Sequence, residues 1–119
     1  MKEYDIFIPL YYNDGAAIEP AKLQDVQSRL LERFEGLTYF PQPNQGFWKF
    51  GDMTYRDEIV IFRVISQDRA GSRDFLARLK EHLKRELKQQ EILIIGEASA
   101  RAFHLTNGNC AADKQPWKP

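Results

Sequence analysis

The chain has 119 residues, of which 43% are hydrophobic and 29% charged, and its 17 basic and 17 acidic residues cancel. This length fits a single domain, and this composition is typical of globular rather than disordered or fibrous proteins. Zero net charge argues against nucleic-acid binding by overall charge, so such a role needs a local basic patch. No apolar stretch approaches the ~20 residues that cross a bilayer, and no signal-peptide pattern opens the sequence. We therefore expect a cytoplasmic protein.

The first two predicted elements are a strand and a helix. Residues 4–12 alternate in the manner of a strand, with Ile6 and Ile8 on one face. Pro9 has no N–H to donate, which predicts an edge strand or a bulge at that point. A helix is predicted over residues 20–35, because it begins with a proline and continues with apolar residues at spacings of three and four.

A hairpin follows the first helix. Residues 37–45 begin with β-forming residues and then contain two prolines, which predicts a short strand followed by a loop. Residues 47–55 predict two strand arms about a tight turn at Gly51-Asp52, since glycine accepts a positive φ. The second arm continues into residues 58–65, which are almost wholly apolar and predict a central strand.

The second half of the chain predicts one more helix and one more strand. Ser72 is expected to cap a helix that ends near residue 88, with a leucine stripe on its buried face. Residues 91–95 predict the last strong strand, which continues weakly to about residue 105. We therefore expect one domain over residues 1–105 and a polar tail over 106–119.

The resulting order, β-α-β-β-α-β, predicts a ferredoxin-like α+β sandwich, with one antiparallel sheet and two helices on one face. The uncovered face of that sheet would be strongly apolar, because only Arg63 interrupts the run from residue 59 to residue 65. Large exposed apolar surfaces usually mark an interface or a binding groove. A homodimer that pairs through its sheet is the leading expectation.

The string "GLTYF…QGFWKFGDMTYRDEIVIF", followed later by "QQEILI", resembles small bacterial α/β domains of unknown function. In these domains a Gly-Leu-Thr is followed by Gly-x-Trp, a glycine turn, Arg-x-Glu at the start of a strand, and Gln-Glu before the last strand. The resemblance covers roughly residues 5–95 and implies a ferredoxin-like, dimeric domain, but no assigned chemistry. The matching positions are Gly36, Leu37, Thr38, Gly46, Trp48, Gly51, Arg56, Glu58, Gln90 and Glu91.

The best candidates for a site are Arg56 and Glu58, which are two apart at the start of a strand and therefore share one face. There they can orient a polar substrate group, with Arg56 as an anion clamp and Glu58 as a general base. The alternative is a cross-strand ion pair that fixes the register of the hairpin.

Other residues are candidates for lining the same site. Trp48 either stacks on a ligand or packs beneath the hairpin. Gln90 and Glu91 either reach a pocket at the end of the sheet or cap the preceding helix. Tyr11 and Tyr12 can supply hydroxyls to the rim, and His104 is a further candidate for a general base.

Metal and cofactor sites are not predicted. Neither His82 nor His104 belongs to a metal-binding spacing, and Gly-rich phosphate loops are absent from the sequence. The single cysteine, Cys110, has no partner for an internal disulfide.

The second predicted helix carries a basic stripe of Lys80, Lys84 and Lys88, which is either a surface for nucleic acid or an acidic partner, or an ordinary solvated face. The leading hypothesis is therefore a binding or assembly module that takes a small molecule or a partner protein. The alternative is a metal-independent enzyme of the dimeric α+β barrel kind, acting on a small polar substrate. Nucleic-acid binding through the second helix is less favoured.

Overall fold

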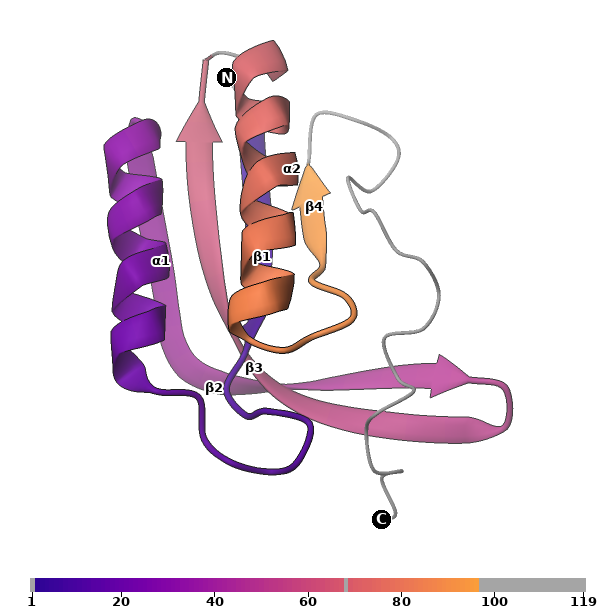
Figure 1. The fold of residues 1–119 in the computed structure, drawn as a ribbon. Coiled ribbons are helices and arrows are strands. Elements are labelled where there is room, and N and C mark those ends of the chain that lie inside the picture. Colours follow the sequence, from indigo (N-terminus) through magenta and orange to yellow (C-terminus); the bar gives the residue numbers. More distant parts are fainter. Residues whose placement is uncertain (1, 68, 97–119) are drawn as a thin grey trace.

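The protein is described by a computed structural model that covers residues 2–67 and 69–96. Within these residues, two helices and four strands follow one another in the predicted order, β-α-β-β-α-β (Figure 1). The elements are β1 (Lys2–Pro9), α1 (Pro20–Arg33), β2 (Gly36–Phe50), β3 (Met53–Ser66), α2 (Arg69–Glu86) and β4 (Ile94–Gly96).

The four strands form one antiparallel sheet in the order β2-β3-β1-β4. β3 is a central strand, as its apolar sequence predicted, and it pairs with β1 from Ser66 opposite Lys2 to Ile59 opposite Pro9. β1 is also internal, so the prediction of an edge strand or a bulge at Pro9 was wrong. Pro9 is the last residue of β1 and lies beyond the residues that pair with β4, so its missing N–H breaks no ladder there.

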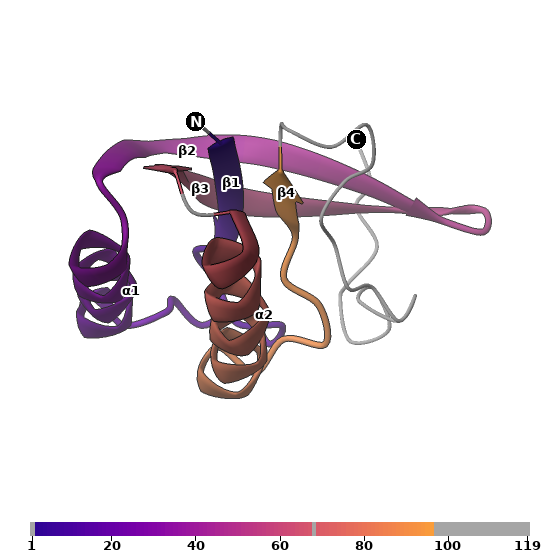
Figure 2. The ribbon, with the colours of Figure 1, turned by 90° about the horizontal axis from the view of Figure 1, so that it is seen from above.

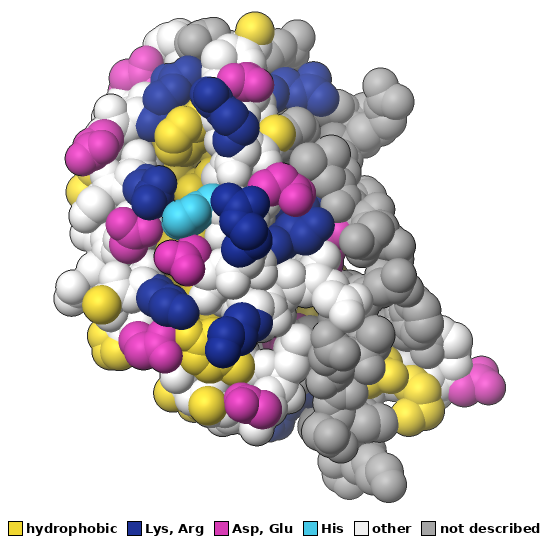
Figure 3. All heavy atoms as spheres, viewed as in Figure 1, with side chains coloured by type: hydrophobic (Ala, Val, Ile, Leu, Met, Phe, Trp, Pro, Cys, Tyr) yellow, Lys and Arg dark blue, Asp and Glu magenta, His cyan; other side chains and the backbone are white. Residues whose placement is uncertain are grey.

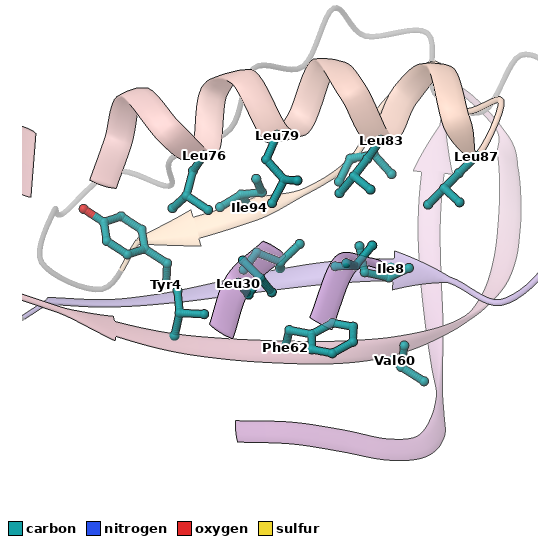
Figure 4. Close-up of a cluster of buried hydrophobic side chains, with 14 of the residues drawn as sticks. Tyr4, Ile8, Leu30, Val60, Phe62, Leu76, Leu79, Leu83, Leu87 and Ile94 are labelled. Atoms are coloured by element: carbon teal, nitrogen blue, oxygen red, sulfur yellow. The ribbon is translucent and has the colours of Figure 1, made fainter. Parts of the chain in front are cut away.

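Both helices pack on one face of the sheet, as expected for an α+β protein (Figure 2). The predicted leucine stripe of α2 is buried against β1, β3 and β4, and Figure 4 shows it above the sheet. Val26 and Leu30 of α1 are also buried, together with Phe34 just after the helix. The core therefore lies between the helices and the alternate residues of the strands, which include Tyr4, Ile6, Ile8, Val60, Phe62, Val64 and Ile94.

The predicted loop after residue 40 is wrong, because β2 runs unbroken from Gly36 to Phe50. Pro41 and Pro43 lie within the strand, at a register shift between Phe40 and Asn44. A proline is tolerated there because β2 is at the edge of the sheet, where one side of the strand has no ladder to complete.

Two other boundaries differ from prediction. α2 begins at Arg69, so Ser72 is not its cap; Ser72 is buried and its hydroxyl donates to Ser66 Oγ at 2.6 Å. β4 begins at Ile94 rather than at residue 91. The predicted continuation to residue 105, the polar tail 106–119, His104 and Cys110 lie outside the described residues.

β2 and β3 continue past the end of β1 as a two-stranded extension, here called the hairpin arm, residues 44–58 (Figure 1). Its tight turn is where the sequence predicted it, with Gly51 at a φ of 63°. The arm carries the stretch from which the candidate residues Trp48, Arg56 and Glu58 come.

The other face of the sheet is covered by neither helix (Figure 2). Phe7, Ile61 and Ile65 alternate with the core residues and are partly buried. Between them Arg63 Nε donates to Asp5 Oδ1 at 2.8 Å. Neither α1 nor α2 combines the length and the apolar character that a membrane span requires.

Candidate functional site

The first half of β3 forms one wall of a pocket, and the loop after β1 forms the other. Because β1 ends opposite Ile59, the chain that leaves β1 lies beside the next residue of β3. The N–H of Leu10 donates to the carbonyl of Glu58 at 2.9 Å and so continues the pairing by one residue. The loop is thereby fixed against the base of the hairpin arm.

The loop itself is held by local hydrogen bonds. Ile18 is buried, and its N–H donates to the carbonyl of Leu10, which closes the base of the loop. At the tip, the N–H of Gly15 donates to the carbonyl of Tyr12 at 2.9 Å, and Asp14 Oδ1 accepts the N–H of Ala16 at 2.9 Å. An aspartate that bonds the backbone two residues on, beside a glycine with a φ of 91°, is ordinary turn chemistry.

Between the loop and β3 lies a cavity of about 470 Å³, here called the rim pocket. This volume falls within the range of small-molecule sites. The pocket is lined by Tyr11, Tyr12, Asn13, Asp14, Gly15, Arg56, Asp57 and Glu58.

Arg56 and Glu58 line this cavity together with Tyr11. By the alternation of β3 the two lie on the face that carries Val60 in the core. The residues opposite them on β2 are Phe47 and Gln45, neither of which is charged. Within the described part of the chain the structure therefore gives neither side chain the cross-strand ion pair that was the alternative explanation.

The rim pocket contains charges of both signs. Three of its lining residues are acidic, namely Asp14, Asp57 and Glu58, and one is the cationic Arg56. By the alternation of β3, the Asp57 side chain lies on the face opposite to Arg56 and Glu58. A guanidinium binds a carboxylate or phosphate through two parallel hydrogen bonds, whereas carboxylates and tyrosine rings attract cations. The lining is therefore suited to a small molecule that carries a cationic group and an anionic group.

The fold has known counterparts among solved structures. A phage SAM lyase in complex with S-methyl-5'-thioadenosine matches with a TM-score of 0.58 and 14% sequence identity, covering 81% of this chain and 79% of that one. A phage SAM lyase in the apo state matches with a TM-score of 0.57 and 15% identity, covering 81% and 78% of the two chains. At such low identity the likeness concerns the fold. No family model and no curated protein sequence matches the chain.

Trp48 lies on the hairpin arm but not in the lining of the rim pocket. It is paired with Tyr55, which places it on the opposite face of the arm from Arg56. Its indole lies beside Gly46, where an added Cβ would be 3.5 Å from Trp48 Nε1. The position of Trp48 favours packing along the strand over contact with a ligand in the rim pocket.

Gln90 and Glu91 lie in the connection between α2 and β4, also away from the rim pocket. Glu91 Oε1 is 2.6 Å from Lys80 Nζ and accepts the N–H of Ile92 at 2.9 Å. The Lys80 side chain is fully buried and the Glu91 side chain is 7% exposed. Glu91 therefore anchors the connection to α2 through a buried ion pair.

The predicted basic stripe on α2 loses its first member, because Lys80 is buried. Lys84 is paired with Glu81, and Figure 3 shows Lys and Arg side chains interleaved with Asp and Glu over the helices. His82 lies 3.9 Å from Asp25 Oδ2, away from the rim pocket. Among residues 2–67 and 69–96 no group of three His, Cys, Asp or Glu side chains is arranged to hold a metal.

Asn13, Asp14 and Asp57 line the pocket but were not identified as candidates from the sequence. The antiparallel pairing of β1 with β3 was the signal available, because it places the residues after Pro9 beside Glu58. The apolar patterns of β1 and β3 set this register, but the sequence alone does not say that the two strands are neighbours.

Proposed function

We propose that the protein binds a small polar molecule in the rim pocket, and that this molecule carries both a cationic and an anionic group. The observation that carries the proposal is the convergence of Arg56, Glu58 and Asp14 with two tyrosines around one cavity. Arg56 holds the anionic group, and the carboxylates of Glu58 and Asp14 with the ring of Tyr11 hold the cation.

The proposed architecture is ferredoxin-like. The strand order β2-β3-β1-β4, antiparallel pairing and two helices on one face support it. In this arrangement the loop after β1 and the start of β3 meet at one end of the sheet, so a binding site there uses residues far apart in sequence.

Binding is testable with two probes, S-adenosylmethionine and S-methyl-5'-thioadenosine, by isothermal titration calorimetry. Both contain a nucleoside, but only the first has a sulfonium together with an amino-acid group. The proposal predicts tighter binding of S-adenosylmethionine, and about tenfold weaker binding in Glu58→Gln and in Arg56→Met, since each loses a charge-assisted contact.

Matched controls separate the pocket from general charge effects. Lys49→Met removes an exposed cation from the same hairpin arm, and Glu32→Gln removes an exposed carboxylate from α1. Both controls should bind as the unaltered protein does. Equal losses in the controls and in the pocket variants, or no binding of either probe at millimolar concentration, would contradict the proposal for this class of ligand.

An enzymatic role is the second candidate, and the fold likeness to phage SAM lyases favours it. In this reading Arg56 orients the substrate and Glu58 is the general base. Incubation with S-adenosylmethionine, followed by chromatography, would then show conversion that Glu58→Gln abolishes. Binding without conversion supports the non-catalytic function instead.

We also propose that the uncovered sheet face pairs with a second copy of the chain. Phe7, Ile61 and Ile65 supply apolar surface there, and such surface is usually covered. Light scattering should give a dimer, and Ile61→Asp should give a monomer. The control Leu31→Asp changes a residue of α1 that is 55% exposed, and should stay dimeric. A monomeric unaltered protein at micromolar concentration would overturn this part of the proposal.

A further inference from the structure

Tyr12, one wall of the rim pocket, is held at its hydroxyl by residues from outside its own loop. The hydroxyl donates to Glu19 Oε2 at 2.5 Å and accepts a hydrogen bond from Lys22 Nζ at 2.9 Å. Because the phenolic hydrogen is directed at Glu19, it is not available to a ligand. What Tyr12 has available for the pocket is therefore its ring rather than its hydroxyl, and contacts from the start of α1 hold the hydroxyl end of that ring.

Glu19 binds the Tyr12 hydroxyl instead of capping α1 with its side chain. It occupies the N-cap position of α1, where a side chain usually accepts a backbone N–H of the first helical turn. Within the described residues the Glu19 carboxylate makes no such capping bond. It instead accepts the Tyr12 hydroxyl and lies 3.4 Å from Lys22 Nζ.

Lys22 links Tyr12 to the C-terminal end of α2. Its Nζ donates to the carbonyl of Glu86, the last residue of α2, at 2.8 Å. The last carbonyls of a helix have no partner within the helix, and lysine side chains commonly satisfy them. With Tyr12, Glu19 and Glu86 as partners, the three donors of the ammonium group are matched by three acceptors.

Lys88 contacts the same ring from beyond the end of α2. Its φ of 53° places it in the left-handed region, where glycine is the usual residue and other residues cost about 1–2 kcal/mol. In this conformation Lys88 Nζ lies 5.6 Å from the centroid of the Tyr12 ring, within the range of a cation–π contact. A lysine at a glycine-type position thus adds a contact that glycine cannot make.

We propose that Lys22 and Lys88 are positioning residues for the rim pocket: they fix the ring of Tyr12 and make the shape of the pocket depend on the C-terminal end of α2. The effect on ligand binding rests on the proposed binding function, but the placement of the ring is testable without a ligand. Removing either lysine frees the ring and weakens binding, although neither residue lines the cavity.

Fluorine NMR of the full chain labelled with 3-fluorotyrosine reads the ring directly, and Tyr12→Phe assigns its signal. In Lys22→Met and in Lys88→Met the Tyr12 signal should shift and broaden while the other tyrosine signals stay in place. The Lys88 side chain is exposed and makes no hydrogen bond in the described residues, so its variant keeps the test available if Lys22→Met does not fold.

Matched controls for this experiment remove a cation from the same two helices without touching Tyr12. Arg29→Met removes an exposed guanidinium two turns after Lys22 on α1, where its partner is Asp25. Arg85→Met removes an exposed cation from the last turn of α2, one turn before Lys88. Both controls should leave the Tyr12 signal unchanged.

Calorimetry with S-adenosylmethionine supplies the second readout, with binding expected to weaken about tenfold in Lys22→Met, as for the loss of one charged hydrogen bond. An unchanged Tyr12 signal in both folded variants overturns the inference, whatever the binding result. A shifted Tyr12 signal in a protein that binds neither probe supports the positioning of the ring and contradicts the proposed function. Failure of the positioning inference and failure of the proposed binding function therefore give different results.

Discussion

The two halves of β3 belong to one strand but lie in different environments. From Ile59 to Ser66 every second side chain is buried between the sheet and the helices, whereas from Met53 to Glu58 none is buried. In the first region, called the core half, packing fixes each side chain. In the second, called the arm half, backbone pairing with β2 fixes the strand and leaves the side chains available for other contacts. Substitutions in the core half should therefore lower the free energy of unfolding much more than substitutions in the arm half.

The largest difference is expected between two phenylalanines. Phe62 in the core half is 1% exposed, and Phe62→Ala should lower the free energy of unfolding by about 3–5 kcal/mol, through lost burial and the cavity that remains. Phe47, opposite Arg56 on the hairpin arm, is 49% exposed, so Phe47→Ala should change it by about 0.5 kcal/mol or less. Urea unfolding measures both. Similar losses of unfolding free energy in the two variants would show that packing does not distinguish the two halves of β3.

A comparable effect is expected at the buried charged pair that joins α2 to the connection before β4. Lys80→Met leaves the Glu91 carboxylate buried without its cation and should cost about 3–5 kcal/mol, as does breaking other buried pairs. Adding Glu91→Met should recover much of that loss, because replacing both partners removes the buried charge. A double-mutant cycle from urea unfolding measures the coupling. Additive losses would show that the two side chains do not depend on each other.

The core half was predictable from sequence and the site was only partly so. The apolar residues 59–65 identified a central strand because burial imposes a pattern on the residues themselves. Arg56, Glu58 and Tyr11 were identified as candidates from their place at strand ends. Their meeting in one pocket depends on the pairing of β1 with β3, which joins residues nearly fifty positions apart and leaves no local pattern.

Two errors have physical reasons of the same kind. The prolines at 41 and 43 suggested a loop, but an edge strand with a register shift accommodates them. Lys80 was placed in an exposed basic stripe from its spacing with Lys84, but it is buried and Glu91 approaches it from another part of the chain. In both cases a tertiary neighbour overrode a correct local tendency.

The turn of the hairpin arm should show a smaller effect. Gly51 has a φ of 63°, and an alanine there would adopt a left-handed conformation that costs about 1–2 kcal/mol. Gly46 is the matched control, because its φ is ordinary and an added Cβ would make only van der Waals contact with Trp48. Gly51→Ala should therefore destabilise the protein, measured by urea unfolding, and Gly46→Ala should not. The reverse order would mean that the register of the arm is not set by its turn.

The smallest expected effect concerns the loop that faces the arm half, and it depends on pH. The hydrogen bond from Tyr12 lowers the pKa of Glu19 below its ordinary value of 4.5, and the hydrogen bond to Tyr12 raises the pKa of Lys22 above its ordinary value of 10.5. A carboxylate with a lowered pKa stabilises the fold above its ordinary value, and this contribution disappears as the pH falls through the lowered pKa. For Lys22 the contribution is present below its ordinary value and disappears as the pH rises through the raised pKa.

The cluster should therefore be intact between the two ordinary values and weaken on either side. Tyr12→Phe removes the hydroxyl, so the difference in unfolding free energy between the unaltered protein and this variant should be constant near neutral pH and shrink in acid. The control is Asp25→Asn, which removes a carboxylate that pairs with Arg29 on α1, away from the loop; the acid-dependent difference should persist in that background. A difference that stayed constant down to pH values at which Glu19 is protonated would mean that the Tyr12 hydroxyl does not depend on the carboxylate. The ring of Tyr12 would then be held by Lys22, Lys88 and its own loop, without a contribution from Glu19.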